Sequence, residues 1–298
     1  MIAPLAARSL LFAPGDSERK IAKASASAAD LVLLDLEDSV AAANKPAARA
    51  IVADHLRTPE RRNAQWVRIN PLDGEHALSD LAAIVAGRPD GIMLPKALRA
   101  DADRLHHYLS ALEAAAGLPI GGIATMVVAT ETAQATFGLG NYAGTPRLAA
   151  LTWGAEDSAA AFGASSNRAP DGSYDFPYQM LRALTLAGAC AAGVTPIETI
   201  HTDFRDTAGL AEVAATARRA GFRGMMAIHP DQVPIINAAF SPTSAEIDHA
   251  ERIVALFAAN PGMGTIGMDG AMIDLPHLKQ AQTLLALARS AAATGSAA

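Results

Sequence analysis

Short apolar runs recur eight times along the chain, each bounded by turn-forming residues and separated from the next by an amphipathic stretch. Most runs are continuously apolar, which is typical of strands covered on both faces of a parallel sheet. Eight βα units are enough to close a barrel, so we predict an α/β fold, a (β/α)8 TIM barrel with a C-terminal helical extension. An open doubly wound sheet is the alternative. The runs lie at residues 9–13, 31–36, 66–70, 91–95, 122–128, 148–153, 195–200 and 224–228.

Helical periodicity fills the gaps between these runs. A barrel of this kind takes about 250 residues, so we assign residues 1–242 to a barrel catalytic domain and residues 243–298 to the extension. The extension is predicted to hold helices at residues 244–259 and 276–293, joined by a glycine-rich link at residues 261–270. The predicted barrel helices lie at residues 18–28, 45–56, 77–86, 101–116, 131–139, 157–162, 177–192 and 208–220.

The composition excludes several other classes of protein. The one cysteine among 298 residues, Cys190, rules out a disulfide framework and a thiolate zinc site and is typical of a reducing compartment. The formal net charge of −6, with no basic run, argues against nucleic acid or an anionic membrane surface as the main partner. No apolar stretch approaches the roughly 20 residues of a spanning helix, and no secretory signal is evident. We therefore expect a cytoplasmic protein.

Polar residues follow the strand runs, at the end where a barrel of this kind carries its chemistry. If the strands are assigned correctly, these residues converge on one mouth of the barrel. An open sheet would instead spread them along an edge. In chain order they are Asp35, Glu37, Asp38, Arg68, Asn70, Lys96, Glu131, Glu156, Asp157, Glu198, His201 and His229.

Glu131 and Asp157 are the candidate metal ligands, because they are carboxylates from adjacent βα loops. Hard oxygen ligands without cysteine or paired histidine favour Mg2+ or Mn2+ over zinc, and Mg2+ commonly takes only one or two carboxylates from the protein. The alternative is that each residue lies in the first turn of a helix and offsets the helix dipole. The spacing by itself leaves both interpretations open.

Arg68 ends an apolar run, where an unpaired guanidinium is costly unless an anion binds it. Its planar fork matches a carboxylate through two hydrogen bonds. The partner is either a substrate carboxylate or one of the acids Asp35, Glu37 and Asp38, and the sequence does not decide between them. Three acids within four residues repel one another unless a metal or an arginine lies nearby.

Other signals are weaker. Residues 13–17 form a turn into a helix with Asp16 or Ser17 at its N-cap, where an anion could also bind. His229 is either catalytic or held in a structural hydrogen bond. No Gly-x-Ser-x-Gly, Walker or Gly-x-Gly-x-x-Gly motif is present, so serine hydrolase, P-loop and dinucleotide-binding interpretations have no support.

Eight short segments carry a family resemblance when they are taken together and in order. They are RSLLFAPG (8–15), LLDLEDSV (33–40), VRIN (67–70), LPK (94–96), ETA (131–133), WGAED (153–157), IHP (228–230) and MIDLP (272–276). With these segments the chain resembles the citrate lyase beta-subunit family, which includes malyl-CoA lyases and citramalyl-CoA lyases. The resemblance runs over nearly the whole chain.

This resemblance implies a Mg2+-bearing barrel, often trimeric or hexameric. Such enzymes cleave or form a carbon–carbon bond between a 2-oxo acid and an acetyl-CoA or acyl-CoA enolate. Glu131 and Asp157 match the family's metal ligands, and Arg68 matches the arginine that binds the oxo-acid carboxylate. Asp274 matches an aspartate that reaches a neighbouring subunit's site as general acid or base in malyl-CoA lyases.

The resemblance also implies contacts with coenzyme A. Phe12 and Lys23 fall where the family contacts coenzyme A, whereas Ser17 stands where malyl-CoA lyases carry an arginine. Glu37 and Asp38, with Asp35, are expected to orient water on the metal. The residues assigned catalytic roles are Arg68, Asp274, Glu37 and Asp38, those assigned substrate binding are Arg68, Phe12, Lys23 and Lys96, and the metal ligands are Glu131 and Asp157.

We therefore predict a Mg2+-dependent carbon–carbon lyase that acts on a 3-hydroxy-acyl-CoA of the malyl, citramalyl or citryl type. Its expected partners are a small 2-oxo acid, an acyl-CoA and further copies of its own chain in a trimer or hexamer. Three alternatives stay open: a thioesterase acting on malyl-CoA, an aldolase acting on a free 2-oxo acid without coenzyme A, and a non-enzymatic binding subunit of a multi-subunit lyase.

Overall fold

The computed structural model describes residues 2–59 and 61–295 of the chain. The chain divides into two compact units, Met1–Asn237 and Ala238–Ala298. Every strand of the large sheet belongs to the first unit. None of the described helices combines the length and the apolar character needed to cross a membrane.

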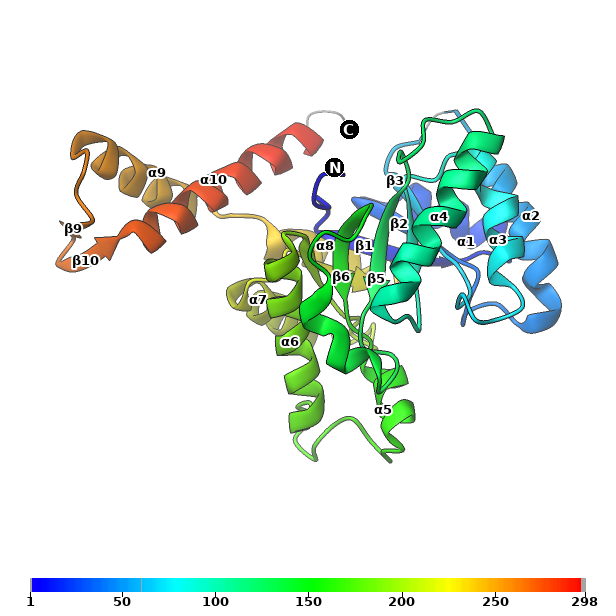
Figure 1. Cartoon of the computed structure of the whole chain (residues 1–298). Helices are drawn as coiled ribbons and strands as arrows, with labels where there is room; N and C mark the ends of the chain where they lie inside the picture. Colours follow the sequence, from blue (N-terminus) through cyan, green and yellow to red (C-terminus); the bar gives the residue numbers. More distant parts are fainter. Residues whose placement is uncertain (1, 60, 296–298) are drawn as a thin grey trace. The chain divides into compact units, whose positions relative to one another are not determined.

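Eight parallel strands form a closed barrel in the order in which they occur along the chain (Figure 1). β1 pairs with β8 through Ser9 and Met225, which closes the barrel. The strands are β1 (Ser9–Pro14), β2 (Leu31–Asp35), β3 (Ala64–Arg68), β4 (Gly91–Leu94), β5 (Ala124–Val128), β6 (Leu148–Thr152), β7 (Thr195–Glu198) and β8 (Gly224–Ala227). The predicted α/β barrel is therefore confirmed over the open sheet, and all eight strand runs lie where they were expected.

Buried side chains from all eight strands form one cluster that fills the barrel interior. Alternate residues enter it, such as Leu31 and Leu33 of β2 and Met126 and Val128 of β5. Successive strand residues point to opposite faces, so the residues between them face the surrounding helices. Val32 is fully buried there as well. Burial on both faces explains why the strand runs are continuously apolar.

Helices follow most of the strands, as the periodicity predicts. They are α1 (Glu18–Ser25), α2 (Lys45–Leu56), α3 (Ala77–Ile84), α4 (Arg99–Ala115), α5 (Ala155–Phe162), α6 (Phe176–Ala192), α7 (Thr207–Ala220) and α8 (Gln232–Phe240). Shorter 3-10 segments lie at η1 (Ala42–Asn44), η2 (Val85–Gly87) and η3 (Ala135–Asn141). Helix α8 was not predicted. Its second to fifth residues, Val-Pro-Ile-Ile, have low helix propensity, and the proline is tolerated because it lies in the first turn.

The helix predicted at residues 131–139 is wrong. A turn follows β5, and only the 3-10 segment η3 comes after it. Gly138, Gly140 and Asn141 disfavour a regular α-helix here. Glu131 therefore does not lie in the first turn of a helix, and the helix-dipole interpretation of this residue fails. Asp157, in contrast, does lie in the first turn of α5.

The second unit consists of two helices and a hairpin. They are α9 (Ser244–Ala259), the antiparallel strands β9 (Thr265–Met268) and β10 (Ala271–Asp274), and α10 (Leu275–Gly295). Ile253 and Phe257 of α9 pack with Ile273 of β10 in a small core. The predicted glycine-rich link is therefore partly a β-hairpin. Its turn residues, Asp269 and Gly270, both have positive φ, which is the geometry that favours an Asp-Gly pair in a two-residue hairpin turn.

Candidate active site

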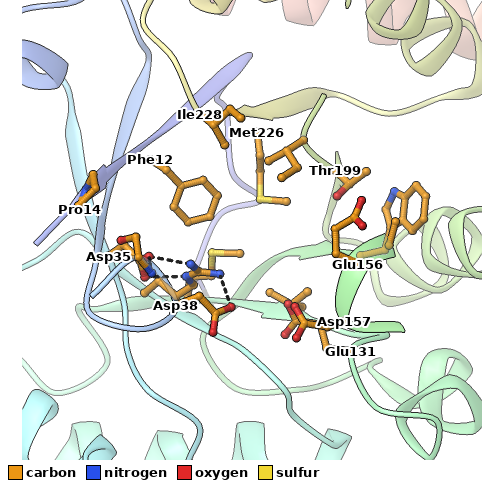
Figure 2. Close-up of a pocket in the computed structure, with 18 residues that line it drawn as sticks. Phe12, Pro14, Asp35, Asp38, Glu131, Glu156, Asp157, Thr199, Met226 and Ile228 are labelled. Carbon is orange, nitrogen blue, oxygen red and sulfur yellow. Dashed lines mark hydrogen bonds and ion pairs between the residues drawn. The ribbon is translucent and has the colours of Figure 1, made fainter. Parts of the chain in front are cut away.

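A cavity of about 340 Å3 opens at the carboxyl ends of the barrel strands, within the first unit (Figure 2). Its charged lining comes from the carboxyl ends of four strands, β2, β3, β5 and β6, and includes half of the polar residues that were predicted to converge on one mouth. The charged lining residues are Asp35, Asp38, Arg68, Glu131, Glu156 and Asp157. The remaining lining residues are Phe12, Pro14, Ser39, Met93, Val128, Trp153, Gly154, Ala155, Thr199, Ile200, Met226 and Ile228.

Arg68, the last residue of β3, forms a two-pronged ion pair with Asp35, the last residue of β2. Its Nε and Nη2 donate hydrogen bonds of 2.7 Å to the two carboxylate oxygens of Asp35. Its Nη1 lies 3.1 Å from Oε2 of Glu37, and its guanidinium lies 4.7 Å from the centre of the Phe12 ring. Both partners are at the ends of adjacent paired strands, and the register places them opposite each other. The ion-pair interpretation of Arg68 is therefore what the structure shows, although the same side chain lines the cavity.

The pair sets the charge state of this wall of the cavity. Burial opposes ionisation of Asp35, but the hydrogen bonds and the charge of Arg68 outweigh it and hold the pKa of Asp35 below its usual value. Burial likewise opposes the charged form of Arg68, and Asp35 raises the pKa of Arg68 above its usual value. Both groups are ionised at neutral pH.

Glu131 and Asp157 lie together on the opposite side of the cavity (Figure 2). Glu131 is 7% exposed, and its Oε2 accepts a hydrogen bond of 2.6 Å from the backbone N–H of Lys96. Burial, together with the nearby charge of Asp157, raises the pKa of Glu131 to about 8. These two carboxylates would hold a divalent cation, whose charge would offset both the burial and the repulsion, so the residues fit a metal site.

Gly154 shapes the space beside Glu131. A Cβ atom at this position would lie 3.0 Å from both Cγ and Oε1 of Glu131, closer than side chains normally approach. A larger residue in place of Gly154 would therefore push the carboxylate of Glu131 away by a few tenths of an ångström. Among residues 2–59 and 61–295, no group of three or more His, Cys, Asp or Glu could hold a metal ion. Two carboxylates suit Mg2+, which takes its other ligands from water and substrate.

Lys96 joins the two acidic sides of the site. Its ammonium donates to Oε1 of Glu37 and lies 3.2 Å from Oδ2 of Asp38. It also lies 3.3 Å from Oδ1 of Asp157. Burial raises the pKa of Glu37 to about 7, although Arg68 and Lys96 act against this shift. Lys96 is therefore neither a solvated surface lysine nor a lining residue of the cavity. It pairs with three acids that surround it.

The acidic loop after β2 is held from behind by a buried lysine that the sequence did not single out. Lys45 is 9% exposed, and its three ammonium protons are matched by the carbonyl oxygens of Leu36 and Glu37 and by Oδ1 of Asn70. Asn70 in turn donates to Leu36 and to the fully buried Asp80. This network fixes the backbone that carries Glu37 and Asp38.

Two further polar residues support the far wall of the cavity. Glu198, at the end of β7, accepts hydrogen bonds of 2.6 Å from Nε1 of Trp153 and from Nε of Arg182. Gln232 is 1% exposed. Its Oε1 accepts from the backbone N–H groups of Ile228 and His229, and its Nε2 donates to the carbonyl of His201. Glu198 follows a strand run and was noted for that reason, whereas nothing in the sequence marked Gln232.

Several predicted residues do not lie at this cavity. Lys23 is exposed in the last turn of α1 and does not line it. Ser17 is the N-cap of α1 and accepts from the backbone N–H of Lys20, as predicted for a capping residue. His229 stacks on Phe204 outside the lining. Asp274 belongs to the second unit, at the end of β10, where its Oδ1 lies 2.5 Å from Nδ1 of His277.

The arrangement agrees with comparisons to known proteins. A sequence model of the HpcH/HpaI aldolase/citrate lyase family matches residues 8–230. The chain belongs to this family. The citrate lyase subunit beta-like protein of Mycobacterium tuberculosis is 35% identical over 275 residues, which cover 92% of this chain and 93% of the relative. The (3S)-malyl-CoA thioesterase of Cereibacter sphaeroides is 37% identical over 290 residues, which cover 96% of each chain.

A solved structure shows the same fold with ligands. It is CitE from Mycobacterium tuberculosis in complex with magnesium, acetoacetate and coenzyme A, and it matches with a TM-score of 0.78 and 34% sequence identity. The match covers 95% of this chain and 98% of the other. The predicted family and barrel are therefore confirmed, and the predicted magnesium is present in a solved member of the family. The family includes both lyase and thioesterase names, so membership does not fix the reaction.

Proposed function

We propose that this protein is a Mg2+-dependent carbon–carbon lyase that cleaves or forms a 3-hydroxy-acyl-CoA, yielding a 2-oxo acid and an acyl-CoA. The observation that carries this proposal is the pairing of two chemistries in one cavity. Glu131 and Asp157 offer hard oxygen ligands on one side (Figure 2). The guanidinium of Arg68 also lines the cavity, where it is paired with Asp35. A solved member of the family holds magnesium, a 3-oxo acid and coenzyme A together.

Each side of the cavity has a distinct task in this reaction. Magnesium, when bound by Glu131 and Asp157, supplies Lewis-acid stabilisation of the oxygen that gains charge. Arg68 provides a second positive charge for the oxo-acid end of the substrate, and Asp35 holds the guanidinium in a fixed plane. Asp38 lines the cavity and Glu37 lies behind it, and both hold the ammonium of Lys96 at the edge of the site. The apolar wall of Phe12 and Met226 suits the acyl portion.

We also propose Asp274 as the general acid or base, supplied by a neighbouring copy of the chain in a homo-oligomer. Support comes from its match to the family aspartate in the MIDLP segment and from its chemistry. A hydrogen bond from His277 lowers the pKa of Asp274, which keeps its carboxylate in the ionised form that accepts a proton but makes it a weaker base. In the condensation direction it would remove a proton from the thioester methyl group. In cleavage it would return that proton to the enolate.

Thioester hydrolysis is the second candidate, and a specific observation favours it. The relative with 37% identity over 96% of both chains is a (3S)-malyl-CoA thioesterase. The same cavity could hold the thioester while water attacks its carbonyl carbon, and the bond to sulfur would then break. The products differ from those of the lyase: free thiol and a hydroxy acid, with no oxo acid.

The test is a turnover screen with citryl-, malyl-, methylmalyl- and citramalyl-CoA in saturating Mg2+, measuring oxo acid and free thiol separately. The lyase predicts oxo acid without free thiol, whereas thiol without oxo acid identifies the thioesterase. The variant E131Q is the matched control for metal dependence, and turnover that survives in E131Q would contradict the metal role. If no substrate yields either product, the proposed function is overturned.

A further inference from the structure

We propose that Lys96 is a resident counter-cation of the metal site: its ammonium occupies the acidic cluster formed by Glu37, Asp38 and Asp157 and weakens the affinity of the site for Mg2+. The proposal rests on the metal site of the proposed function. It assigns to Lys96 a task other than substrate binding, which is to share the site's negative charge with the metal ion.

The contacts of Lys96 carry this inference. One residue touches both metal-ligand candidates, Glu131 through its backbone N–H at 2.6 Å and Asp157 through its ammonium at 3.3 Å. The same ammonium also contacts Glu37 and Asp38. A lysine that bound only substrate would not need three carboxylate partners of its own.

The backbone of Lys96 is adapted to this position. Its φ angle is 49°, in the left-handed region that a lysine rarely adopts. Lys96 follows β4 and Pro95, and this conformation directs its N–H to Glu131 while its side chain reaches the acidic loop after β2. An unfavourable backbone conformation that persists at a site is held there by the surrounding contacts. Here those contacts are the carboxylates themselves.

Charge balance gives the consequence. Two further acids, Asp35 and Glu131, lie beside the acidic cluster of Glu37, Asp38 and Asp157. The guanidinium of Arg68 pairs with Asp35, Glu37 and Asp38. The ammonium of Lys96 reaches further, to the proposed metal ligand Asp157. Removing that ammonium makes the site more negative, and a divalent cation should bind it more tightly.

The experiment measures Mg2+ binding by isothermal titration calorimetry on the full-length protein, with no substrate present. We expect K96M to lower the Kd for Mg2+ by about fivefold or more, because a nearby positive charge is lost. A site that is merely damaged would bind Mg2+ more weakly, so the direction of the change separates the two roles. In EDTA, K96M should unfold at a lower temperature than the wild type, and Mg2+ should raise its unfolding temperature by a larger amount.

Matched variants complete the design. K96R keeps the charge and should bind Mg2+ close to the wild type, K96Q should follow K96M, and K20M removes an exposed lysine of α1 and should change nothing. An unchanged or increased Kd in both K96M and K96Q would overturn the proposal. It would also be overturned if neither variant folds in saturating Mg2+, because bound metal should replace the missing ammonium. Absence of Mg2+ binding by the wild type would instead overturn the proposed function.

Discussion

At the scale of single residues, this site depends on backbone positions as much as on charged groups. Lys96 adopts a left-handed φ so that its N–H can reach Glu131, and Gly154 leaves the space that the same carboxylate fills. Neither property follows from residue type. The sequence identifies Glu131 and Asp157 as candidates because they follow strands, but it says nothing about what holds their carboxylates in place.

Gly154 gives the first prediction. In G154A the added methyl group would displace the carboxylate of Glu131, so we expect Mg2+ to bind at least about tenfold more weakly while the fold is retained. Calorimetric titration with Mg2+ and circular dichroism measure the two quantities. G140A is the control, because nothing lies within 4 Å of a Cβ atom there and its φ is not positive. If G154A bound Mg2+ as tightly as the wild type, the close approach of Gly154 to the carboxylate of Glu131 would not matter for metal binding, which would contradict this prediction.

At the scale of secondary-structure elements, buried polar contacts join segments at both ends of the barrel. Arg147, just before β6, forms a fully buried ion pair with Glu113 of α4. The N–H groups of Gly121 and Ile123 also donate to Glu113. On the opposite end, Gln232 joins the loops after β7 and β8. Apolar periodicity cannot reveal such contacts, because they join segments that are distant in sequence.

The Glu113 pair predicts a pH dependence of stability. Burial opposes the charge of Glu113, but the hydrogen bonds from Arg147 and the two backbone N–H groups outweigh it, so the pKa of Glu113 lies below its usual value of 4.5. A depressed folded-state pKa stabilises the fold above the unfolded pKa and loses that contribution as the pH falls through the folded pKa. We expect E113Q to lower the free energy of unfolding by about 3 kcal/mol at pH 7, because it leaves Arg147 buried and unpaired.

Urea denaturation at pH 7 and in steps below pH 4.5 measures this effect. The wild type and E113Q should differ less in free energy of unfolding at the acidic pH values, because Glu113 of the wild type takes up a proton there. E212Q, which changes an exposed glutamate of α7, should match the wild type throughout. If the difference in unfolding free energy between the wild type and E113Q were the same at every pH, Glu113 would not be ionised in the folded protein as assigned.

Gln232 predicts a local effect at the cavity mouth. Q232L removes the partner of the N–H groups of Ile228 and His229 and of the carbonyl of His201, so we expect a loss of about 2 kcal/mol in unfolding free energy. Amide hydrogen exchange at residues 228 and 229 should become faster, and the KM for the acyl-CoA should rise, because Ile228 lines the cavity. Q134L, at an exposed position, is the control. Unchanged exchange at both amides would contradict the role of Gln232.

At the scale of the whole molecule, the cavity and Asp274 belong to different compact units. The first unit carries the proposed metal ligands and Arg68. The second unit carries the MIDLP segment in a small core of its own. The proposal that Asp274 acts in the site of a neighbouring chain therefore depends on how the chains assemble. It can be tested with oligomers that contain two different variants.

E131Q and D274N should each lose turnover, the latter by about a hundredfold or more as expected for loss of a general acid or base. In mixed oligomers, a site that takes Glu131 from one chain and Asp274 from another is intact in about a quarter of cases. Coexpression of the two variants with different affinity tags, followed by tandem purification, removes oligomers of a single variant and should therefore restore about a quarter to a third of turnover. D248N, an exposed aspartate of α9, is the control. No recovery in the mixed oligomers would contradict the exchange between chains.

Much of the fold could be predicted because its strands and helices follow from local patterns of apolar residues. All eight strands and most helices follow from runs of apolar residues and their periods, which depend on residues a few positions apart. The failures have local causes too. The helix expected after β5 is a 3-10 segment because its glycines disfavour an α-helix. The Asp-Gly pair that forms the hairpin turn of the second unit was predicted to be part of a glycine-rich link.

The sequence alone determined the eight βα units and the acids and one arginine at the carboxyl ends of their strands, because strand bounds follow from local hydrophobicity. That the strands close into a barrel, and do not form an open sheet, is a result of the tertiary structure. Only the tertiary structure decided which of these charges meet. Lys96 contacts an acid 59 positions away, and Arg68 contacts Asp35 at a separation of 33. The physical reason is that ion pairs form between atoms a few ångströms apart, and closure of the barrel sets those distances.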